Sequence, residues 1–301
     1  MSEMVADKSK PIVDDSSKNE MEEAPALWHD QAQRNCAPLY IQDRFLRDGY
    51  DASTRNATAT FVHFKGHYYA CTCRHVVEIA KKRRDSGSPF SGLALGYKEG
   101  FQPLSFITAD GLKDALQIVP GTEGEEEYLD LAIADITSVW PRFSAEWGSR
   151  AIDMDHDRWH EPRWARAEML AAAGWPEMGK RNATNDEGKP IVRGTIALVI
   201  AKVKGGLSKT DRIVMMESRL DAPHGWFFSG MSGGPIYVIQ DDKLVPVGLL
   251  YDGWPQKKGV KHESYDECDI VIRGVILTPQ NLERWLEAAG LNEPAGNKEM
   301  K

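Results

Sequence analysis

The sequence contains few cysteines and no long hydrophobic segment. Only 4 of its 301 residues are cysteine, and no run of roughly 18 consecutive apolar residues occurs, so we expect no membrane-spanning helix and no membrane partner. The first residues also lack the apolar segment of roughly 7 to 15 residues that marks a secretory signal. We therefore predict a cytoplasmic protein. In that compartment the thiols of Cys36, Cys71, Cys73 and Cys268 stay reduced, and we expect no structural disulfide.

The chain also lacks an excess of positive charge. It carries 37 Lys and Arg against 45 Asp and Glu, which gives a formal net charge of −8. Proteins that bind nucleic acid neutralise phosphates with clustered Lys and Arg, so we predict no nucleic-acid partner. The one basic run, residues 81–84 (KKRR), has no interleaved aromatic residues and is typical of a solvated surface turn.

The composition that remains is typical of a globular protein with flexible ends. Hydrophobic residues make up 42% of the chain and charged residues 27%, which is enough apolar material for a sizeable core. Residues 1–27 are polar, acidic and poor in large apolar side chains, so we expect a disordered tail. We place the folded domain at residues 28–290 and a second flexible tail at 291–301.

Strand patterns dominate the folded part. From Ala57 the text ATATFVHFKGHYYACTC alternates and is rich in Thr, Val, Phe and Tyr, which predicts a hairpin that turns at Lys65 and Gly66. The next segment, CRHVVEIAKKRRD, has the longer period of a short helix. Further strands are predicted at residues 127–136, 195–205, 211–220, 234–240 and 243–253.

Two segments depart from the strand pattern. Residues 154–174 lose it and end in an Ala-rich stretch, so we expect an insertion with helical character. Residues 279–289 predict a C-terminal helix, because Thr278 suits the N-cap, Pro279 the first helical position and Gly290 the stop. The apolar stripe of this helix consists of Leu282, Trp285, Leu286 and Ala289.

Two groups of residues raise the question of a metal site. In Cys71-x-Cys73-x-His75 three zinc-type ligands alternate, and alternate residues of a strand share one face. A structural zinc site usually has four ligands in paired spacings, so we favour small buried thiols. Residues 153–161 (DMDHDRWHE) gather Asp, His and Glu, but no ligand motif frames them. We favour a hydrated acidic loop there, and metal binding by that loop stays open. We predict no metal and no other cofactor.

The segment GMSGGPIY places Ser232 among glycines. A nucleophile elbow of the α/β-hydrolase kind requires a helix after the serine and a histidine further on. Here Pro235 and a strand-like run follow, and His262 is the sole downstream histidine. A serine hydroxyl otherwise needs a base and an acid from elsewhere in the chain. His75 and Asp130 supply both, upstream and in that order.

These segments resemble the chymotrypsin-like (trypsin-like) serine peptidases, and within them the bacterial members related to the high-temperature-requirement proteases. TCRHVV is similar to the family's Thr-x-x-His-Val block, DLAIADI to its Asp-Leu-Ala block, and GMSGGPIY to its Gly-x-Ser-Gly-Gly-Pro block. GWP resembles a turn between the second and third blocks, and VPVGLLYDG resembles the strand beside the substrate cleft. The resemblance spans roughly residues 40 to 290, and no PDZ-like segment follows the catalytic region.

The resemblance implies an all-β fold of two packed six-stranded antiparallel β-barrels. The N-terminal barrel is expected at about residues 40–140 and the C-terminal barrel at about 165–275. The helical insertion at residues 154–174 and the C-terminal helix at 279–289 are expected in addition to the two barrels. The active site is expected in the cleft between the barrels.

The resemblance also implies a role for each residue of the motifs. His75 is expected to act as general base and then general acid, Asp130 to orient it, and Ser232 to form an acyl-enzyme. The backbone N–H groups of Gly230 and Ser232 are expected to form the oxyanion hole. Asp135 is the alternative to Asp130, and we interpret it as a strand-end cap. His63, His67 and His224 carry no motif and are interpreted as structural.

The expected substrate pocket has Trp226 at its base, six residues before the nucleophile, and is walled by Asp252 and Gly253. A ring in place of a buried carboxylate predicts an apolar pocket and cleavage after Ala, Val or Leu. Asp252 is interpreted as a solvent-facing turn carboxylate. If it points inward, a preference for Lys or Arg is expected instead.

Some positions depart from the family pattern. Met231 replaces the acidic residue that pairs with a new N-terminus in secreted digestive members, so that form of activation is not expected. Cys73 and Arg74 stand where small or polar residues are usual. Regulation by a protein partner, a ligand or the acidic tail stays open.

The function that we predict is a cytoplasmic serine endopeptidase acting on a protein or peptide, with a dedicated substrate in a stress or defence setting. The alternatives are a noncatalytic protein-binding module on a protease fold and a latent protease that needs a partner.

Overall fold

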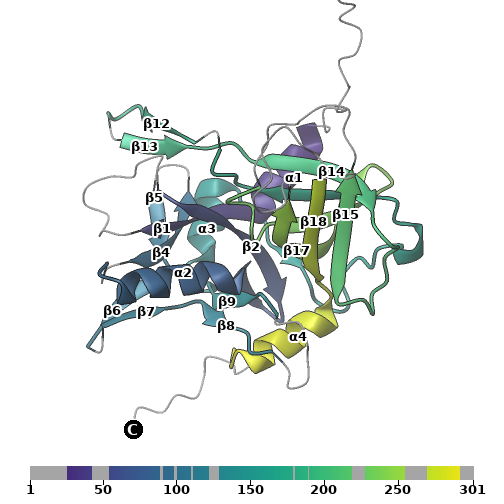
Figure 1. Cartoon of the computed structure of the whole chain (residues 1–301), viewed down its shortest axis with the longest axis horizontal. Helices are drawn as coiled ribbons and strands as arrows, with labels where there is room; N and C mark the ends of the chain where they lie inside the picture. The colour runs from purple at the N-terminus through teal and green to yellow at the C-terminus, as the bar shows by residue number, and fades with distance from the viewer. Residues whose placement is uncertain are drawn as a thin grey trace, which may run out of the picture.

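The computed structural model describes residues 26–42, 54–88, 91–97, 100–109, 111–121, 129–178, 180–188, 190–218, 228–254 and 270–291. Almost all of the two predicted tails, residues 1–27 and 291–301, lies outside these ranges. Trp226, His224 and Cys268 lie outside them too. The described chain is mostly β and forms two halves side by side (Figure 1).

The N-terminal half is built on an eight-stranded sheet. Its strands follow the order β5-β4-β1-β2-β3-β9-β8, and β10 joins β2 in parallel. Among the described residues, the short end strands β5 and β8 do not pair with each other, so this half is an open sheet. The prediction of two barrel-like halves is confirmed, but this half has eight strands instead of the predicted six and does not close within the described ranges. The strands are β1 Cys36–Gln42, β2 Asn56–Phe64, β3 His67–Thr72, β4 Gly92–Tyr97, β5 Gly100–Pro103, β8 Gln117–Ile118, β9 Ala132–Asp135 and β10 Ile152–Asp153, with a separate hairpin of β6 Ser105–Thr108 and β7 Gly111–Asp114.

The C-terminal half is the predicted six-stranded antiparallel barrel. It closes in the order β11-β14-β15-β18-β17-β16. A two-stranded hairpin of β12 and β13 extends from it (Figure 1). The strands are β11 Met169–Gly174, β12 Arg181–Thr184, β13 Pro190–Arg193, β14 Ala197–Val203, β15 Ile213–Ser218, β16 Pro235–Gln240, β17 Lys243–Trp254 and β18 Ile270–Ile276.

Two hairpin turns follow from their residues. The β2–β3 turn has Lys65 at φ 50° and Gly66 at φ 80°, and the β16–β17 turn has Asp241 at φ 50° and Asp242 at φ 57°. Two consecutive residues at positive φ give a turn whose twist matches that of the flanking strands, and Gly and Asp tolerate this backbone. The first turn is the one that the sequence predicts.

The segment 154–174 is not a helical insertion, and that prediction is wrong. Its only helical part is a single 3-10 turn, Trp164–Arg166, and its Ala-rich end is the barrel strand β11. Ala171, Ala172 and Ala173 are fully buried, and β11 pairs with β14 on one side and β16 on the other. Pairing on both edges overrides the high helix propensity of alanine.

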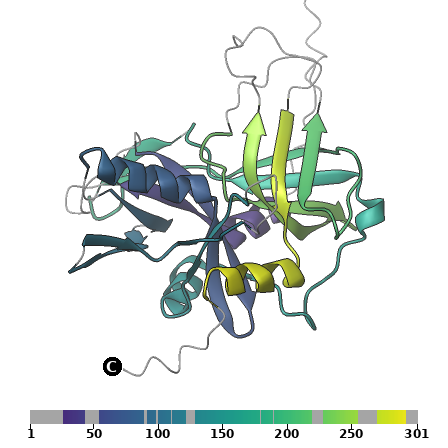
Figure 2. The ribbon, with the colours of Figure 1, turned by 60° about the horizontal axis from the view of Figure 1, so that its bottom comes forward.

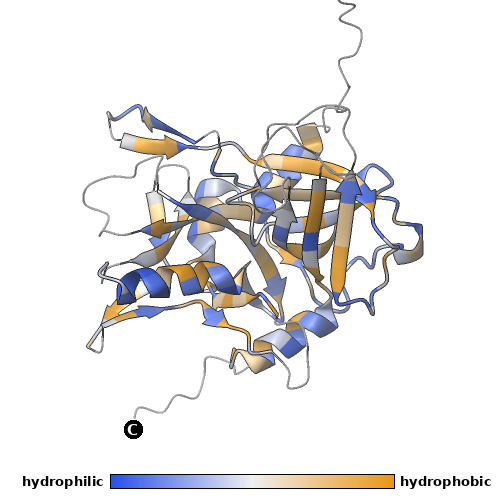
Figure 3. Cartoon of the chain, viewed as in Figure 1, coloured by the Kyte–Doolittle hydropathy of each residue, from blue (hydrophilic) through white to orange (hydrophobic). Residues whose placement is uncertain are grey.

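The helices are α1 Ala26–Asn35, α2 Arg74–Asp85, α3 Trp140–Trp147 and α4 Pro279–Ala288. No helix in the described part of the chain is long and apolar enough to cross a membrane. The hydropathy colours mark α2 as amphipathic (Figure 3), because Val76, Val77 and Ala80 are buried while Lys81 and Lys82 are exposed. The basic run 81–84 is therefore part of a helix and not a solvated turn, and its last residue, Arg84, pairs with the buried Asp114 at 2.6 Å.

The C-terminal helix α4 confirms its prediction. Thr278 caps it by accepting a hydrogen bond from the Asn281 amide at 3.1 Å, and Gly290 follows it at φ 69°. The helix lies across the junction of the two halves (Figure 2). There its buried side chains share one core with residues of the sheet and of the barrel, namely Val62, Phe64, Leu249, Val275, Leu282, Trp285 and Leu286.

Candidate active site

His75 and Asp130 meet because their strands are neighbours. Thr72, the last residue of β3, pairs with Ala132, the first residue of β9, and the two strands are antiparallel. The chain just after β3 and the chain just before β9 therefore lie at the same edge of the sheet. His75 stands there in the first turn of α2, and Asp130 two residues before β9.

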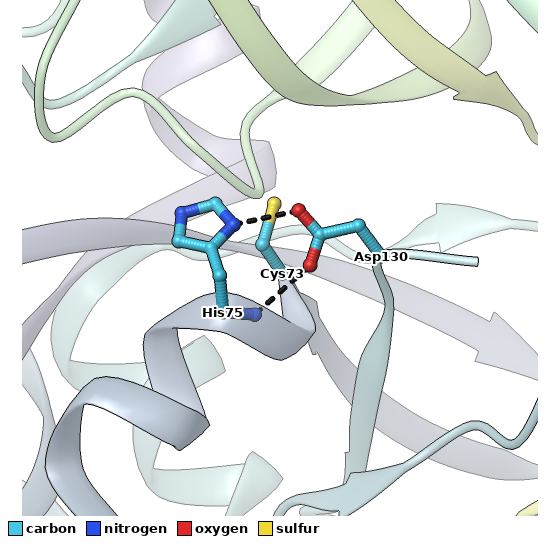
Figure 4. Close-up of side chains that lie close together, drawn as sticks. All are labelled: Cys73, His75 and Asp130. Carbon is cyan, nitrogen blue, oxygen red and sulfur yellow. Dashed lines mark hydrogen bonds and ion pairs between the residues drawn. The ribbon is translucent and has the colours of Figure 1, made fainter. Parts of the chain in front are cut away.

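The Asp130 carboxylate holds His75 at two points. The backbone N–H of His75 donates to Oδ1 at 2.9 Å, and the ring Nδ1 lies 2.6 Å from Oδ2 (Figure 4). An ionised carboxylate only accepts, so this contact selects the tautomer that carries its proton on Nδ1. Nε2, on the far side of the ring in Figure 4, is then free to act as a proton acceptor.

Ser232 lies in a tight loop before β16. Met231 donates to the Phe228 carbonyl and Gly234 to the Met231 carbonyl, each at 2.9 Å. Gly233 has φ +91°, and a Cβ there would lie 2.2 Å from the carbonyl oxygen of Thr58. Only glycine fits this backbone and this close approach.

The N-terminal sheet holds this loop through two threonines of β2. The Thr58 amide donates to the Ser232 carbonyl at 2.9 Å, and the Thr58 hydroxyl donates to the Gly230 carbonyl at 2.8 Å. The Thr60 hydroxyl donates to the Gly233 carbonyl at 2.7 Å. Both threonines are fully buried. Sequence reasoning missed their role, although threonines that alternate with alanines in ATAT place two hydroxyls on one face of the strand.

His75, Asp130 and Ser232 line one cleft of about 320 Å³. In the described structure no hydrogen bond joins His75 to Ser232. Catalytic hydrogen bonds are often long in enzymes without substrate and shorten when substrate binds. The other residues of the cleft wall are Phe228, Ser229, Leu250, Tyr251, Asp252 and Gly253.

The two backbone amides expected in the oxyanion hole differ from the neighbouring amides of the loop in their hydrogen bonding. The N–H groups of Met231, Gly233 and Gly234 each donate to a carbonyl. Within the described ranges, the N–H groups of Gly230 and Ser232 have no acceptor. Gly230 has φ +93°. Two unused donors beside a serine hydroxyl suit an oxygen that gains negative charge.

Asp252 is not a turn residue, and that interpretation is wrong. It lies in strand β17 opposite Arg273, beyond an irregularity between Leu250 and Asp252, and it lines the cleft. Its Oδ2 accepts from the Arg273 guanidinium at 2.5 Å. The sequence did not reveal this partner, because Arg273 is on a neighbouring strand that was not predicted. Gly253 lines the cleft as expected.

Cys71 and Cys73 do not share a face, because β3 ends at Thr72 and Cys73 is already the N-cap residue of α2. Cys71 points into the core shared with α4, where burial raises its pKa to about 12. Cys73 donates from its sulfur to the Leu250 carbonyl at 3.2 Å. Burial, followed by the nearby Asp130, raises its pKa well above the ordinary value. The Cys71, Cys73, His75 ligand set is therefore not formed.

Two other groups lie away from the cleft walls. Asp135 accepts from the Thr137 amide at 2.8 Å, as expected for a strand-end cap, and it lies 3.4 Å from His67 Nδ1. His63 of β2 joins Asp153 and Asp155, and Arg158 pairs with both carboxylates.

Similar folds occur among solved structures. A thermostable serine protease, AL20, from an extremophilic microorganism is 12% identical, with 86% of this chain and 99% of that chain covered and a TM-score of 0.44. The protease Anisep from Arthrobacter nicotinovorans is 12% identical, with 86% and 97% covered and a TM-score of 0.42. Human heparin binding protein is 12% identical, with 89% and 96% covered and a TM-score of 0.45. No protein-family model and no curated protein matches the sequence. The chemistry of the site has to be judged from its own geometry.

Proposed function

We propose that this protein is a serine endopeptidase with His75, Asp130 and Ser232 as its catalytic triad. The observation that carries the proposal is the convergence of a carboxylate-bound imidazole and a glycine-flanked serine on one cleft. A serine hydroxyl is a weak nucleophile, and it needs a base of this kind beside it.

In the proposed reaction, Ser232 Oγ attacks the carbonyl carbon of the scissile peptide bond while His75 Nε2 takes its proton. The oxyanion that forms accepts from the amides of Gly230 and Ser232. His75 then gives the proton to the leaving amine, which departs as the C–N bond breaks. Water, deprotonated by the same imidazole, hydrolyses the acyl-enzyme and returns Ser232. Asp130 holds the Nδ1–H tautomer and stabilises the imidazolium in each half of the cycle.

The cleft wall favours an extended polypeptide as substrate. Asp252 and Gly253 pair with β18 on one side, and within the described residues β18 is their only strand partner. An extended peptide can add to such an edge by main-chain hydrogen bonds. This supports cleavage within a flexible protein segment.

We further propose that the protein is related to the high-temperature-requirement proteases, that it is cytoplasmic, and that it cleaves a dedicated substrate in a stress or defence setting. The three described cysteines, Cys36, Cys71 and Cys73, are free and buried, which suits a reducing compartment.

A second candidate is a latent form of the same enzyme that a partner activates. The observation that favours it is the absence, in the described structure, of a hydrogen bond between His75 and Ser232. The test is digestion of an unfolded protein by wild type and by Ser232→Ala. Cleavage by wild type alone supports the active enzyme. Cleavage by wild type only after addition of cell extract supports the latent form, and equal cleavage by both proteins rejects the proposal.

A further inference from the structure

Three metal-binding side chains come together at the wall of the cleft. The sulfur of Cys73, a ring nitrogen of His75 and a carboxylate oxygen of Asp130 all lie within 4.8 Å of one another (Figure 4). Cys73 is buried beneath the pair, whereas the side chains of His75 and Asp130 are 42% and 24% exposed. An ion arriving through the cleft therefore reaches the group between the imidazole and the carboxylate.

The donor set is one sulfur, one nitrogen and one oxygen, which is the set that zinc takes in proteins, with water as a fourth ligand. In a tetrahedral zinc site such donors lie about 3.5 Å apart. His75 Nδ1 and Asp130 Oδ2 are only 2.6 Å apart, so an ion has to replace the proton between them and separate them by about 1 Å. The sulfur of Cys73 has to approach by no more than a similar amount. Rotation of the half-exposed His75 ring provides a movement of this size. Magnesium and calcium prefer oxygen ligands, so the sulfur selects against them.

Charge at the site also favours a cation. Asp130 is a member of the group, and no Lys or Arg is among the described residues that line the cleft. The second group on this chain, His63 with Asp153 and Asp155, already has a cation, because the Arg158 guanidinium pairs with both carboxylates. The cleft group is therefore the better zinc site.

We propose that Zn²⁺ binds Cys73, His75 Nδ1 and Asp130 and thereby switches the hydrolase off. The Cys73 thiol loses its proton to solvent, and the imidazole proton moves through solvent from Nδ1 to Nε2. An Nε2 that carries a proton cannot accept one from Ser232. The inhibitory effect rests on the proposed serine peptidase function, whereas the binding of the ion does not.

Binding is measured on the full chain, kept reduced, by calorimetric titration with Zn²⁺ and by optical titration with Co²⁺, whose thiolate complexes have a charge-transfer band. Wild type should bind one ion and show the band. Cys73→Ala should lose the band and bind Zn²⁺ at least about tenfold more weakly, because loss of a direct ligand costs no less than loss of an outer contact. Cys73→Ser keeps the size and hydrogen-bonding capacity of the side chain, so it should fold if Cys73→Ala does not, and it should also lose the band.

Asp153→Asn is the matched control, because it alters the second group only, and it should bind both ions as wild type does. Absence of one-to-one binding, or binding that Asp153→Asn abolishes and the Cys73 variants retain, would overturn the zinc site. The inhibition is checked by labelling Ser232 with a fluorophosphonate. Zn²⁺ should block labelling of wild type, and a chelator should restore it. Zinc binding without any labelling would contradict the peptidase function and the inhibition while leaving the site itself supported.

Discussion

The hydroxyl of Thr58 in β2 donates a hydrogen bond to the carbonyl oxygen of Gly230, 2.8 Å away in the nucleophile loop of the other half. The Thr58 hydroxyl oxygen itself accepts a hydrogen bond from the Trp175 amide at 2.9 Å. Thr58 is fully buried, so neither contact is replaced by water. One side chain of the N-terminal sheet thus fixes the backbone beside the amide that we assign to the oxyanion hole.

Loss of that hydroxyl should slow the chemical step. Thr58→Val keeps the shape of the side chain but cannot donate, so the Gly230 amide becomes less well aimed. We expect kcat to fall about tenfold or more, somewhat less than for removal of an oxyanion donor itself, with little change in KM. Thr58→Ser should recover most of the loss.

Thr60→Val is the control for the threonine substitutions. It removes a similar buried hydrogen bond, to the Gly233 carbonyl beyond the nucleophile. Both valine variants should lose thermal stability, Thr58→Val more than Thr60→Val because it also leaves the Trp175 amide without its acceptor. Only Thr58→Val should lose kcat. An equal loss of kcat in the two would show that Thr58 has a structural role alone.

Removal of the base or of its partner should abolish most of the activity. His75→Ala and Asp130→Asn should each lower kcat about 10⁴-fold, since the first removes the proton acceptor and the second favours the wrong tautomer. Circular dichroism should show an intact fold. Asp135→Asn, outside the cleft, should retain activity. If Asp130→Asn is nearly as active as wild type, Asp130 is not the orienting residue.

The primary specificity should be apolar. The Asp252 carboxylate that lines the cleft is already paired with Arg273, so it offers little to the positive charge of a substrate. A peptide library should give cleavage after Ala, Val or Leu. Profiles dominated by Lys or Arg would contradict this prediction, and Asp252→Asn would then show whether Asp252 is the source of the preference.

Stability should decline in alkaline solution. Burial raises the thiol pKa of Cys36 and of Cys71 from 9.0 to about 12. Between these values the folded chain holds protons that the unfolded chain has lost, so the free energy of unfolding falls as the pH rises from 9.0 towards 12. Urea unfolding across this window should show the fall. Cys71→Ala should have a shallower dependence on pH, and a slope equal to that of wild type would refute the assignment.

Local sequence patterns predict a feature of the fold correctly where interactions between neighbouring residues determine it. The cap, stripe and stop of α4 lie within a few residues of one another, and the turn at Lys65 and Gly66 depends on the backbone of two residues. The pair of His75 and Asp130 was predicted from motifs, and the adjacency of β3 and β9 brings the two residues together.

Such local patterns do not predict which distant segments of the chain pair with each other. The alanines of β11 favour a helix until two strands flank them, and Asp252 resembles a turn residue until Arg273 is placed opposite it. Thr58 resembles an ordinary strand residue, because its partner in the loop of Ser232 is far away in the chain. These features depend on register across strands, which the sequence alone does not specify.

The most direct test of the triad is the mass of the intact protein after reaction with a fluorophosphonate, followed by peptide mapping. If Ser232 is the nucleophile and His75 is its base, we expect one adduct per chain, located on Ser232. Labelling of His75→Ala at the same reagent concentration should be strongly reduced, because the hydroxyl then lacks its base. Labelling of His75→Ala at the wild-type rate, or an adduct on another residue that persists in Ser232→Ala, would contradict these assignments.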